Sequence, residues 1–264
     1  MSKHQVNLLK RLGAAATIAV PFILVLGGWQ LLAIYGGFNA KLVPNLRVVA
    51  ATFLRLSENG ILIAATEATL SRLLMGFSLA ALFGVAIGIL MGRRQWVEEM
   101  LLPLISFIYP IPGIAYAPLF ILWFGLGNTP AILLVAVAST FPVIINAWKG
   151  VTAVKPIWIK SAESMGARGL CLFWKIIIPG ALPYILTGLR LGLATAWRIL
   201  VAVEMLTSVK HGLGWLIFGS QAFLDTDVML ATIVVIGLIG FTLEKLVFET
   251  IERMTVVRWG MLTA

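Results

Sequence analysis

Long stretches of apolar residues set the strongest constraint on how this chain can fold. About six of them approach the roughly 20 residues that a helix needs to cross a bilayer, and they span residues 12–35, 71–91, 100–124, 130–148, 183–207 and 229–250. Of all residues, 60% are hydrophobic and only 12% are charged, which is about half the charge of a soluble domain. The sequence therefore predicts an all-α polytopic membrane protein, built as a single transmembrane domain over residues 1–264.

The first stretch follows Lys3, Lys10 and Arg11 and so shares one property with a secretory signal. It continues to about Tyr35, however, whereas the apolar part of a signal peptide has roughly 7–15 residues, and no small-residue cleavage site closes it. We expect a retained first span.

Basic residues indicate the orientation of the spans. Lys and Arg are enriched in the cytoplasmic loops of membrane proteins, and thirteen of the 20 flank one side of the predicted spans, whereas four flank the other. We expect both termini and the connection 149–182 to be cytoplasmic. This distribution accounts for the net charge of +9 without nucleic-acid binding.

The sequence contains no recognisable catalytic pattern. There is no G-x-x-x-x-G-K-[ST] phosphate-binding loop, no H-E-x-x-H and no G-x-S-x-G. Cys171 is the single cysteine, and His4 and His211 are predicted on opposite sides of the membrane. We expect no enzyme activity, metal or cofactor on this chain, so that any ATPase is a separate subunit.

Small residues indicate where helices pack closely. Gly84, Gly88 and Gly92 recur every four residues along the second span, which predicts close approach of another helix. The stretch 38–66 is mixed polar and apolar, and we expect it to form an external loop with a helix near the interface.

The connection 149–182 has the pattern of a short helix. Pro156 suits its first turn and Gly166 its C-terminal exit, while Trp158, Ala162 and Met165 recur at i, i+4 and i+7 and predict one apolar face. Such a helix could lie on the lipid surface or enter a groove of a soluble partner. Periodicity alone leaves both open.

The pattern around this helix resembles the signature loop of ABC importer permeases, in which E-A-A, three residues, G, nine residues and I-x-L-P are expected. Gly166 is followed by nine residues and then by Ile176-x-Ile178-Pro179. We expect a second short helix, about 168–178, that stops at Pro179.

One departure from the signature concerns its acidic residue. The E-A-A triplet falls on Lys160-Ser161-Ala162, so that lysine stands where an acid is expected, and Glu163 lies three positions on. The helix itself is expected regardless of this substitution, whereas the identity of any salt bridge to an ATPase is left open.

The resemblance covers most of residues 70–260 and is to the nitrate/sulfonate/taurine class of these permeases. Further similar segments follow in order: Tyr109-Pro-Ile-Pro112, Ala117–Gly127, Leu182–Arg190, Gly212-Leu-Gly214, Phe223–Asp227 and Arg258-Trp-Gly-Met261.

The resemblance implies a type I importer permease in the bacterial inner membrane that moves a small, anionic solute. Its implied partners are a second permease copy, two cytoplasmic subunits that bind ATP and Mg, and a periplasmic binding protein. Residues implied to couple to the ATPase are Trp158, Lys160, Ser161, Ala162, Glu163, Met165, Gly166, Ala167 and Pro179.

Prolines interrupt the third span, and each removes an amide donor from the helix. Non-helical backbone at membrane depth is tolerated only against protein or a water-filled cavity. We therefore expect the translocation path along this broken helix, although a kink needed only for packing is the alternative. The residues concerned are Tyr109, Pro110, Pro112, Gly113 and Tyr116.

Charged residues within spans are further candidates, because they face the bundle interior or water. Glu204 lies about 21 Å along its helix from Arg190, and points about 120° away from Arg198, so each needs a partner elsewhere. For Glu204 we favour an interhelical contact or gate over substrate contact. Arg198 is the better candidate to meet an anion, and Arg72 is placed equally well at the external interface.

The loops 38–66 and 208–228 are expected to dock the binding protein. Asp225 and Asp227 could pair with basic residues there or remain solvated loop acids. The rival interpretation is a stand-alone secondary transporter or channel, which would require inverted repeats or buried carboxylates for a coupling ion. The sequence shows no such repeat, and Glu204 is its only candidate carboxylate.

Overall fold

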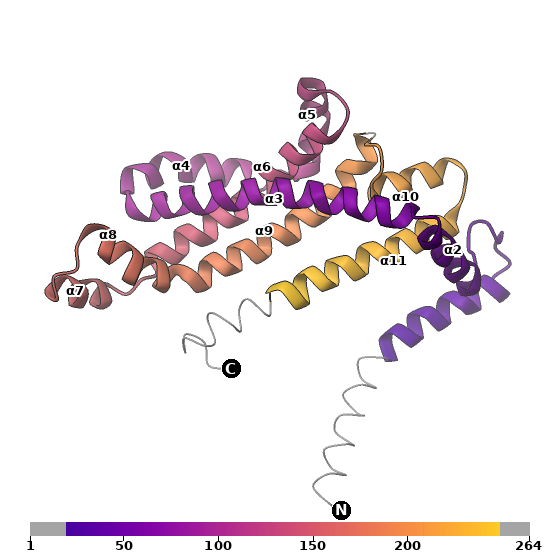
Figure 1. Cartoon of the computed structure of the whole chain (residues 1–264), viewed down its shortest axis with the longest axis horizontal. Helices are drawn as coiled ribbons and strands as arrows, with labels where there is room; N and C mark the ends of the chain where they lie inside the picture. Colours follow the sequence, from indigo (N-terminus) through magenta and orange to yellow (C-terminus); the bar gives the residue numbers. More distant parts are fainter. Residues whose placement is uncertain (1–19, 208, 249–264) are drawn as a thin grey trace, which may run out of the picture. The chain divides into compact units, whose positions relative to one another are not determined.

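The computed structural model describes residues 20–207 and 209–248, and its described elements are helical (Figure 1). After an apolar helix, Val20–Tyr35, the chain forms α2 (Leu46–Glu58), α3 (Ile61–Arg93), α4 (Gln95–Ile108), a 3-10 turn η1 (Gly113–Tyr116), α5 (Ala117–Phe124), α6 (Asn128–Thr152), α7 (Pro156–Ser164), α8 (Gly169–Leu172), a π-helical turn η2 (Phe173–Ile177), α9 (Ile178–Leu206), α10 (Leu213–Ala222), α11 (Thr226–Thr242) and a second π-helical segment η3 (Leu243–Phe248).

The expected all-helical membrane architecture is confirmed. Helices long and apolar enough to cross a bilayer are Ile61–Arg93, Asn128–Thr152, Gly169–Leu206 and Thr226–Lys245. A fifth crossing arises if Gln95–Ile108 and Gly113–Phe124, which are bent by 89°, form one broken span. Of the expected span 12–35, the described part is the Val20–Tyr35 helix, and the rest lies outside the described residues.

The chain divides into two compact units. Of the described residues, the smaller unit holds 20–62 together with Ile217–Val234, and the larger one holds those of Ile63–Leu216 together with 235–248. In the smaller unit, the expected helix within 38–66 is α2, whose first turn is capped by the side chain of Asn45. The indole of Trp29 donates to the carbonyl of Pro44 at 2.9 Å, which ties the preceding helix to the start of α2.

Glycines join α3 closely to α6 in the larger unit, as their spacing predicted. A Cβ atom on any of the three glycines would lie 2.6–2.7 Å from a side-chain atom of α6. The pairs are Gly84 with Val143, Gly88 with Ala147 and Gly92 with Val151. Because both sets of numbers rise together, the two helices run parallel.

α9 packs on α6 in the opposite direction. Cβ atoms on Gly188 and Gly192 would meet Asn146 and Val143 at 2.8 and 2.7 Å, so the residue numbers rise along one helix while they fall along the other. Figure 1 shows α6 and α9 side by side. With α3 and α9 both against it, α6 is the most enclosed of the candidate spans, since half of its apolar window is buried.

The prediction that a second short helix stops at Pro179 is wrong. α8 continues through η2 into α9, which gives one helical segment from Gly169 to Leu206. Pro179 lies in the first turn of α9, directly after the π-helical turn. A π-helical turn changes the hydrogen-bond register within a helix. The helix therefore continues through Pro179, although proline has no amide hydrogen to donate.

We predict that Gly88→Val destabilises the larger unit by about 1–3 kcal/mol, because the added methyl groups overpack the contact with Ala147. The control is Gly237→Val in α11, where a Cβ meets no atom within 4 Å. Thermal unfolding of the purified protein in detergent micelles compares the two. Equal melting temperatures for both variants would contradict the packing role.

Candidate functional site

A buried ion pair joins α3 to the last turns of α9. Arg72 Nη1 donates to Glu204 Oε1 at 2.5 Å, and the two side chains are 5% and 0% exposed. Thr69 Oγ1 lies one turn before Arg72 and is 3.0 Å from both carboxylate oxygens. A buried charge pair is tolerated when further hydrogen bonds satisfy its remaining polar atoms, and both members of this pair have such bonds.

The other donors of Arg72 reach two further parts of the unit. Its Nε donates to Asn128 Oδ1 at the start of α6, at 2.8 Å. Its Nη2 donates to the carbonyl oxygens of Lys210 and His211, at 3.0 and 2.7 Å. The planar guanidinium thus connects three helices with the segment 209–212, a geometry that the point charge of a lysine could not reproduce.

Backbone amides at the start of α10 complete the surroundings of Glu204. The amide of Gly214 donates to Glu204 Oε2 at 3.0 Å, and the amide of Leu213 donates to Thr69 Oγ1 at 2.9 Å. A Cβ on Gly212 would lie 2.8 Å from the carboxyl carbon of Glu204, and one on Gly214 only 2.1 Å from a backbone oxygen of α9. The Gly212-Leu-Gly214 motif therefore permits the close approach of this backbone to the carboxylate.

Glu204 makes an interhelical contact, as expected, and its partner is Arg72. The placement of Arg72 at the external interface of the membrane stays a prediction. Sequence reasoning missed Arg72 as the partner. The sequence does contain an indication of it, because Thr69 and Arg72 are spaced i, i+3 and lie on one face of an apolar helix.

The broken helix brings its five candidate residues into one cavity. Tyr109, Pro110, Pro112, Gly113 and Tyr116 line it together with Ala138 and Phe141 of α6 and Thr195 and Ile199 of α9. A Cβ on Gly113 would lie 2.6 Å from the side chain of Ile199, so glycine allows the break to approach α9. The cavity wall is thus partly non-helical backbone held against two spans.

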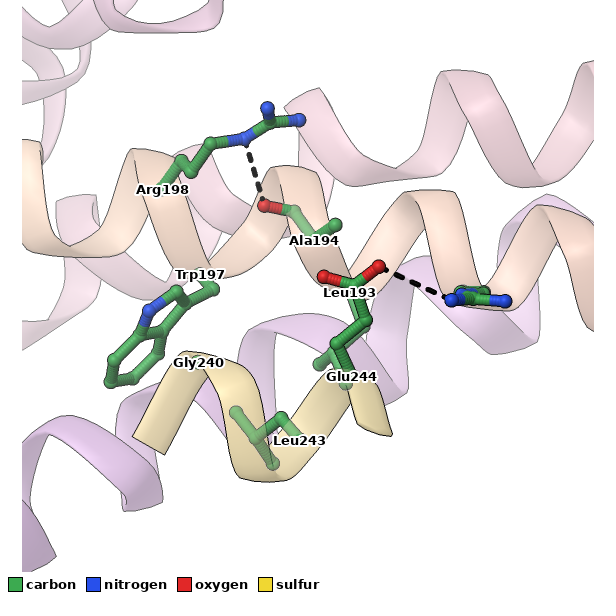
Figure 2. A pocket seen from close by; sticks show the side chains of 8 residues that line it. Leu193, Ala194, Trp197, Arg198, Gly240, Leu243 and Glu244 are labelled. Atoms are coloured by element: carbon green, nitrogen blue, oxygen red, sulfur yellow. Dashed lines mark hydrogen bonds and ion pairs between the residues drawn. The ribbon is translucent and has the colours of Figure 1, made fainter. Parts of the chain in front are cut away.

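Arg198 lies outside that cavity. It is exposed, and its Nε donates to the carbonyl of Ala194 at 3.1 Å. Figure 2 shows Arg198 and Trp197 on opposite edges of α9, with Trp197 beside Gly240. These three residues and Ala194 line a second cavity, between α9 and the end of α11, together with Arg190, Leu193, Leu243 and Glu244.

An ion pair that the sequence did not reveal lies at this second cavity. Arg190 Nη2 is 3.2 Å from Glu244 Oε1, and both side chains are exposed. Arg190 lies too far along α9 from Glu204 to pair with it, and its carboxylate partner is instead Glu244 on a neighbouring helical segment. Among the described residues, Arg198 forms no ion pair with a carboxylate.

Helix α7 begins at Pro156, as predicted, and Gly166 provides the exit. Gly166 has φ +87°, in the left-handed region that favours glycine, and the amide of Ala167 donates back to the carbonyl of Ala162 at 2.9 Å. This arrangement resembles the glycine C-caps that commonly end helices.

The predicted single apolar face of α7 is divided in the structure. Ala162 is buried among Leu172, Ile177 and Ala181, whereas Trp158 and Met165 are 47% and 82% exposed. The buried side of α7 is narrow because a small residue lies at its centre. The remaining coupling candidates Lys160, Ser161 and Glu163 are exposed, and Pro179 is partly buried.

The two acids expected to dock a partner differ in their surroundings. Asp227, in the first turn of α11, accepts a hydrogen bond from Thr52 Oγ1 and lies 4.0 Å from Arg55 Nη2, so it is engaged within the smaller unit. Asp225 is exposed.

We predict that Arg72→Met destabilises the protein by about 3–5 kcal/mol, because it leaves the Glu204 carboxylate buried without its counter-charge. The double variant Arg72→Met/Glu204→Met should regain part of this loss. Glu244→Gln, which removes an exposed pair, should change stability by about 0–1 kcal/mol. A double-mutant cycle from thermal unfolding, with Arg72→Met, Glu204→Met and the double variant, measures the coupling between Arg72 and Glu204. Additive effects of the two single variants Arg72→Met and Glu204→Met would contradict it.

Residues 84–251 match the family described as binding-protein-dependent transport system inner membrane component. The taurine transport system permease protein TauC of Escherichia coli is 44% identical over 177 residues, which are 67% of this chain and 64% of that protein. The putative aliphatic sulfonates transport permease protein SsuC of Bacillus subtilis is 32% identical over 95% of this chain and 89% of its own length. The bicarbonate transport system permease protein CmpB of Synechococcus elongatus is 32% identical over 69% of this chain and 66% of its own. With its helical spans and this match over most of its length, the chain belongs to the family of inner membrane components of binding-protein-dependent transport systems.

Proposed function

We propose that the chain is the permease subunit of an ATP-driven importer for a small anionic solute, and that it works as a dimer with two separate ATPase subunits and a periplasmic binding protein. The family membership supports this function. Relatives are named for taurine, aliphatic sulfonates and bicarbonate, and all three solutes carry an anionic oxygen-rich group. The basic flanks support cytoplasmic termini in a bacterial inner membrane.

The observation that carries the proposal is the surface of α7. Ile157, Trp158 and Met165 expose apolar area around a helix whose only fully buried residue is Ala162. A short helix with exposed apolar residues fits a groove on a soluble partner. Lys155 Nζ lies 5.6 Å from the centre of the Trp158 ring, a cation–π contact that favours an ordered indole on this surface.

The buried side of α7 offers a route for transmitting movement. Ala162 belongs to a core cluster that includes Ala147 and Val151 of α6 and Ala181 and Ile185 of α9. Movement of α7 by the closing ATPases would therefore act on α6 and α9, which pack against each other. A change of access then requires that the ATPase dimer binds one arrangement of these helices better than the other.

The cavity at the broken helix and the exposed edge of α9 support the solute path. An unpaired arginine within a span is costly against lipid and faces water or protein by default. Among the residues that the structure describes, Arg198 has no carboxylate partner, and its guanidinium supplies donors suited to an oxyanion. A secondary transporter would need a carboxylate for its coupling ion, but Glu204 is already bound by Arg72, Thr69 and Gly214.

We predict that Ala162→Trp and Gly166→Val uncouple ATP hydrolysis from uptake, because the first displaces α7 from its core cluster and the second strains its exit. In proteoliposomes with the ATPase subunits, hydrolysis should persist while solute uptake falls. Cys171→Ser, at an exposed position on α8, is the control. Normal uptake with intact ATPase association would contradict the role of α7, and failure of the unaltered chain to associate with an ATPase would contradict the proposed function.

We predict that Arg198→Gln lowers uptake of an anionic solute by about tenfold or more, since a hydrogen bond to a charged group contributes about 1.5–3 kcal/mol. Arg198→Lys should retain part of the activity because the charge remains. The measurement is the initial rate of uptake of radiolabelled solute at saturating binding protein. Unchanged rates for both variants would exclude contact between Arg198 and the solute.

A further inference from the structure

The segment 209–212 presents basic side chains on a fixed backbone. Lys210 and His211 are exposed, while their neighbours Val209 and Gly212 are buried. The carbonyl oxygens of Lys210 and His211 accept hydrogen bonds from Arg72 inside the unit. Their backbone therefore faces the buried ion pair, and their side chains lie on the surface.

We infer that this segment is a preformed basic contact for an acidic surface of the solute-binding protein. The inference rests on the proposed function, which requires such a partner. It assigns the docking charge to Lys210 and His211 in place of Asp227, whose carboxylate is held by Thr52 and Arg55.

Backbone geometry supports a functional role for this segment. His211 has φ +58°, a left-handed conformation that is uncommon outside glycine. Such conformations persist where the surroundings determine them, and they cluster at binding and switch sites. Here the surroundings are the bond from Arg72 to the His211 carbonyl and the close contact of Gly212 with the Glu204 carboxylate.

A fixed backbone also lowers the cost of binding. Ordering a flexible loop at an interface consumes part of the binding free energy, and the Arg72 bonds order this one before any partner arrives. Among the described residues, neither Lys210 nor His211 forms an ion pair within the chain. The charge of Lys210 is therefore available to a partner.

The size of the basic group favours a protein over a lipid surface. Sites that hold anionic membranes use clusters of about 4–8 Lys and Arg residues, whereas this segment has one lysine and one histidine. A few charges at the edge of a protein interface mainly accelerate association with an oppositely charged partner. An acidic patch on the binding protein fits this scale.

The test measures binding of the solute-binding protein encoded beside this chain to the assembled importer in nanodiscs. The variants are Lys210→Glu/His211→Glu, which reverses the charge, and Lys210→Gln/His211→Gln, which removes it. Arg94→Glu is the control, since Arg94 is an exposed basic residue on the predicted cytoplasmic side and lies outside both loops expected to dock the binding protein. Basal ATP hydrolysis in the absence of binding protein reports on folding and assembly.

Charge reversal should weaken the affinity on the order of tenfold, mainly through slower association, and should reduce its dependence on salt. The affinity of the Gln variants should lie between those of the unaltered and the charge-reversed protein. Arg94→Glu should match the unaltered protein, and basal hydrolysis should stay unchanged. Unaltered affinity after charge reversal overturns the inference. It is equally overturned if the effect disappears in nanodiscs without anionic lipid, or if Arg94→Glu weakens binding as much. If the unaltered importer binds no such protein, the proposed function itself fails.

Discussion

The ion pair between Arg72 and Glu204 fixes one end of the larger unit. A charge removed from water must be matched in both sign and hydrogen bonds, which leaves few arrangements available. The guanidinium is planar and offers five donors, and here it bonds a carboxylate on α9, an amide oxygen on α6 and two carbonyls of the segment 209–212. One side chain thereby sets the register of three helices and the position of the chain that leaves α9.

Glycines supply the remaining constraint along the length of the same helices. In lipid, helices gain little from the hydrophobic effect by associating, so van der Waals contact must hold them together. Gly84, Gly88 and Gly92 bring α3 onto α6, and Gly188 and Gly192 bring α9 onto it. The polar node orders one end, and close packing carries that order toward α7 and α8, which Figure 1 shows at the end where α3 and α6 finish.

Features that depend on local pattern could be predicted from the sequence. Apolar length indicated the spans, spacing indicated the glycine contacts, and Pro156 and Gly166 indicated the ends of α7. Glu204 was expected to have an interhelical partner because a lone carboxylate in a span needs one. Its identity could not be derived, because Arg72 lies more than a hundred residues away and its bonding depends on how the helices align.

The errors have a common physical origin in tertiary context. Pro179 is a helix breaker by pattern, yet a π-helical turn before it lets the helix continue. Trp158, Ala162 and Met165 share a periodicity, but the direction in which α7 docks decides which of them is buried. For Asp227 the sequence left pairing and solvation open, and the fold brings Thr52 and Arg55 to it.

The parallel course of α3 and α6 limits how the chain between them can pass through the bilayer. Two spans that run in the same direction start on the same side, so the chain from Arg93 to Asn128 has to return from one side to the other. A chain that goes from one side to the other crosses the bilayer an odd number of times. A re-entrant hairpin crosses it zero times, so it does not fit this connection. If α3 and α6 both cross the bilayer, the bent pair of helices α4 and α5 makes one complete crossing. That crossing then contains a right-angled break lined by Tyr109, Gly113 and Tyr116.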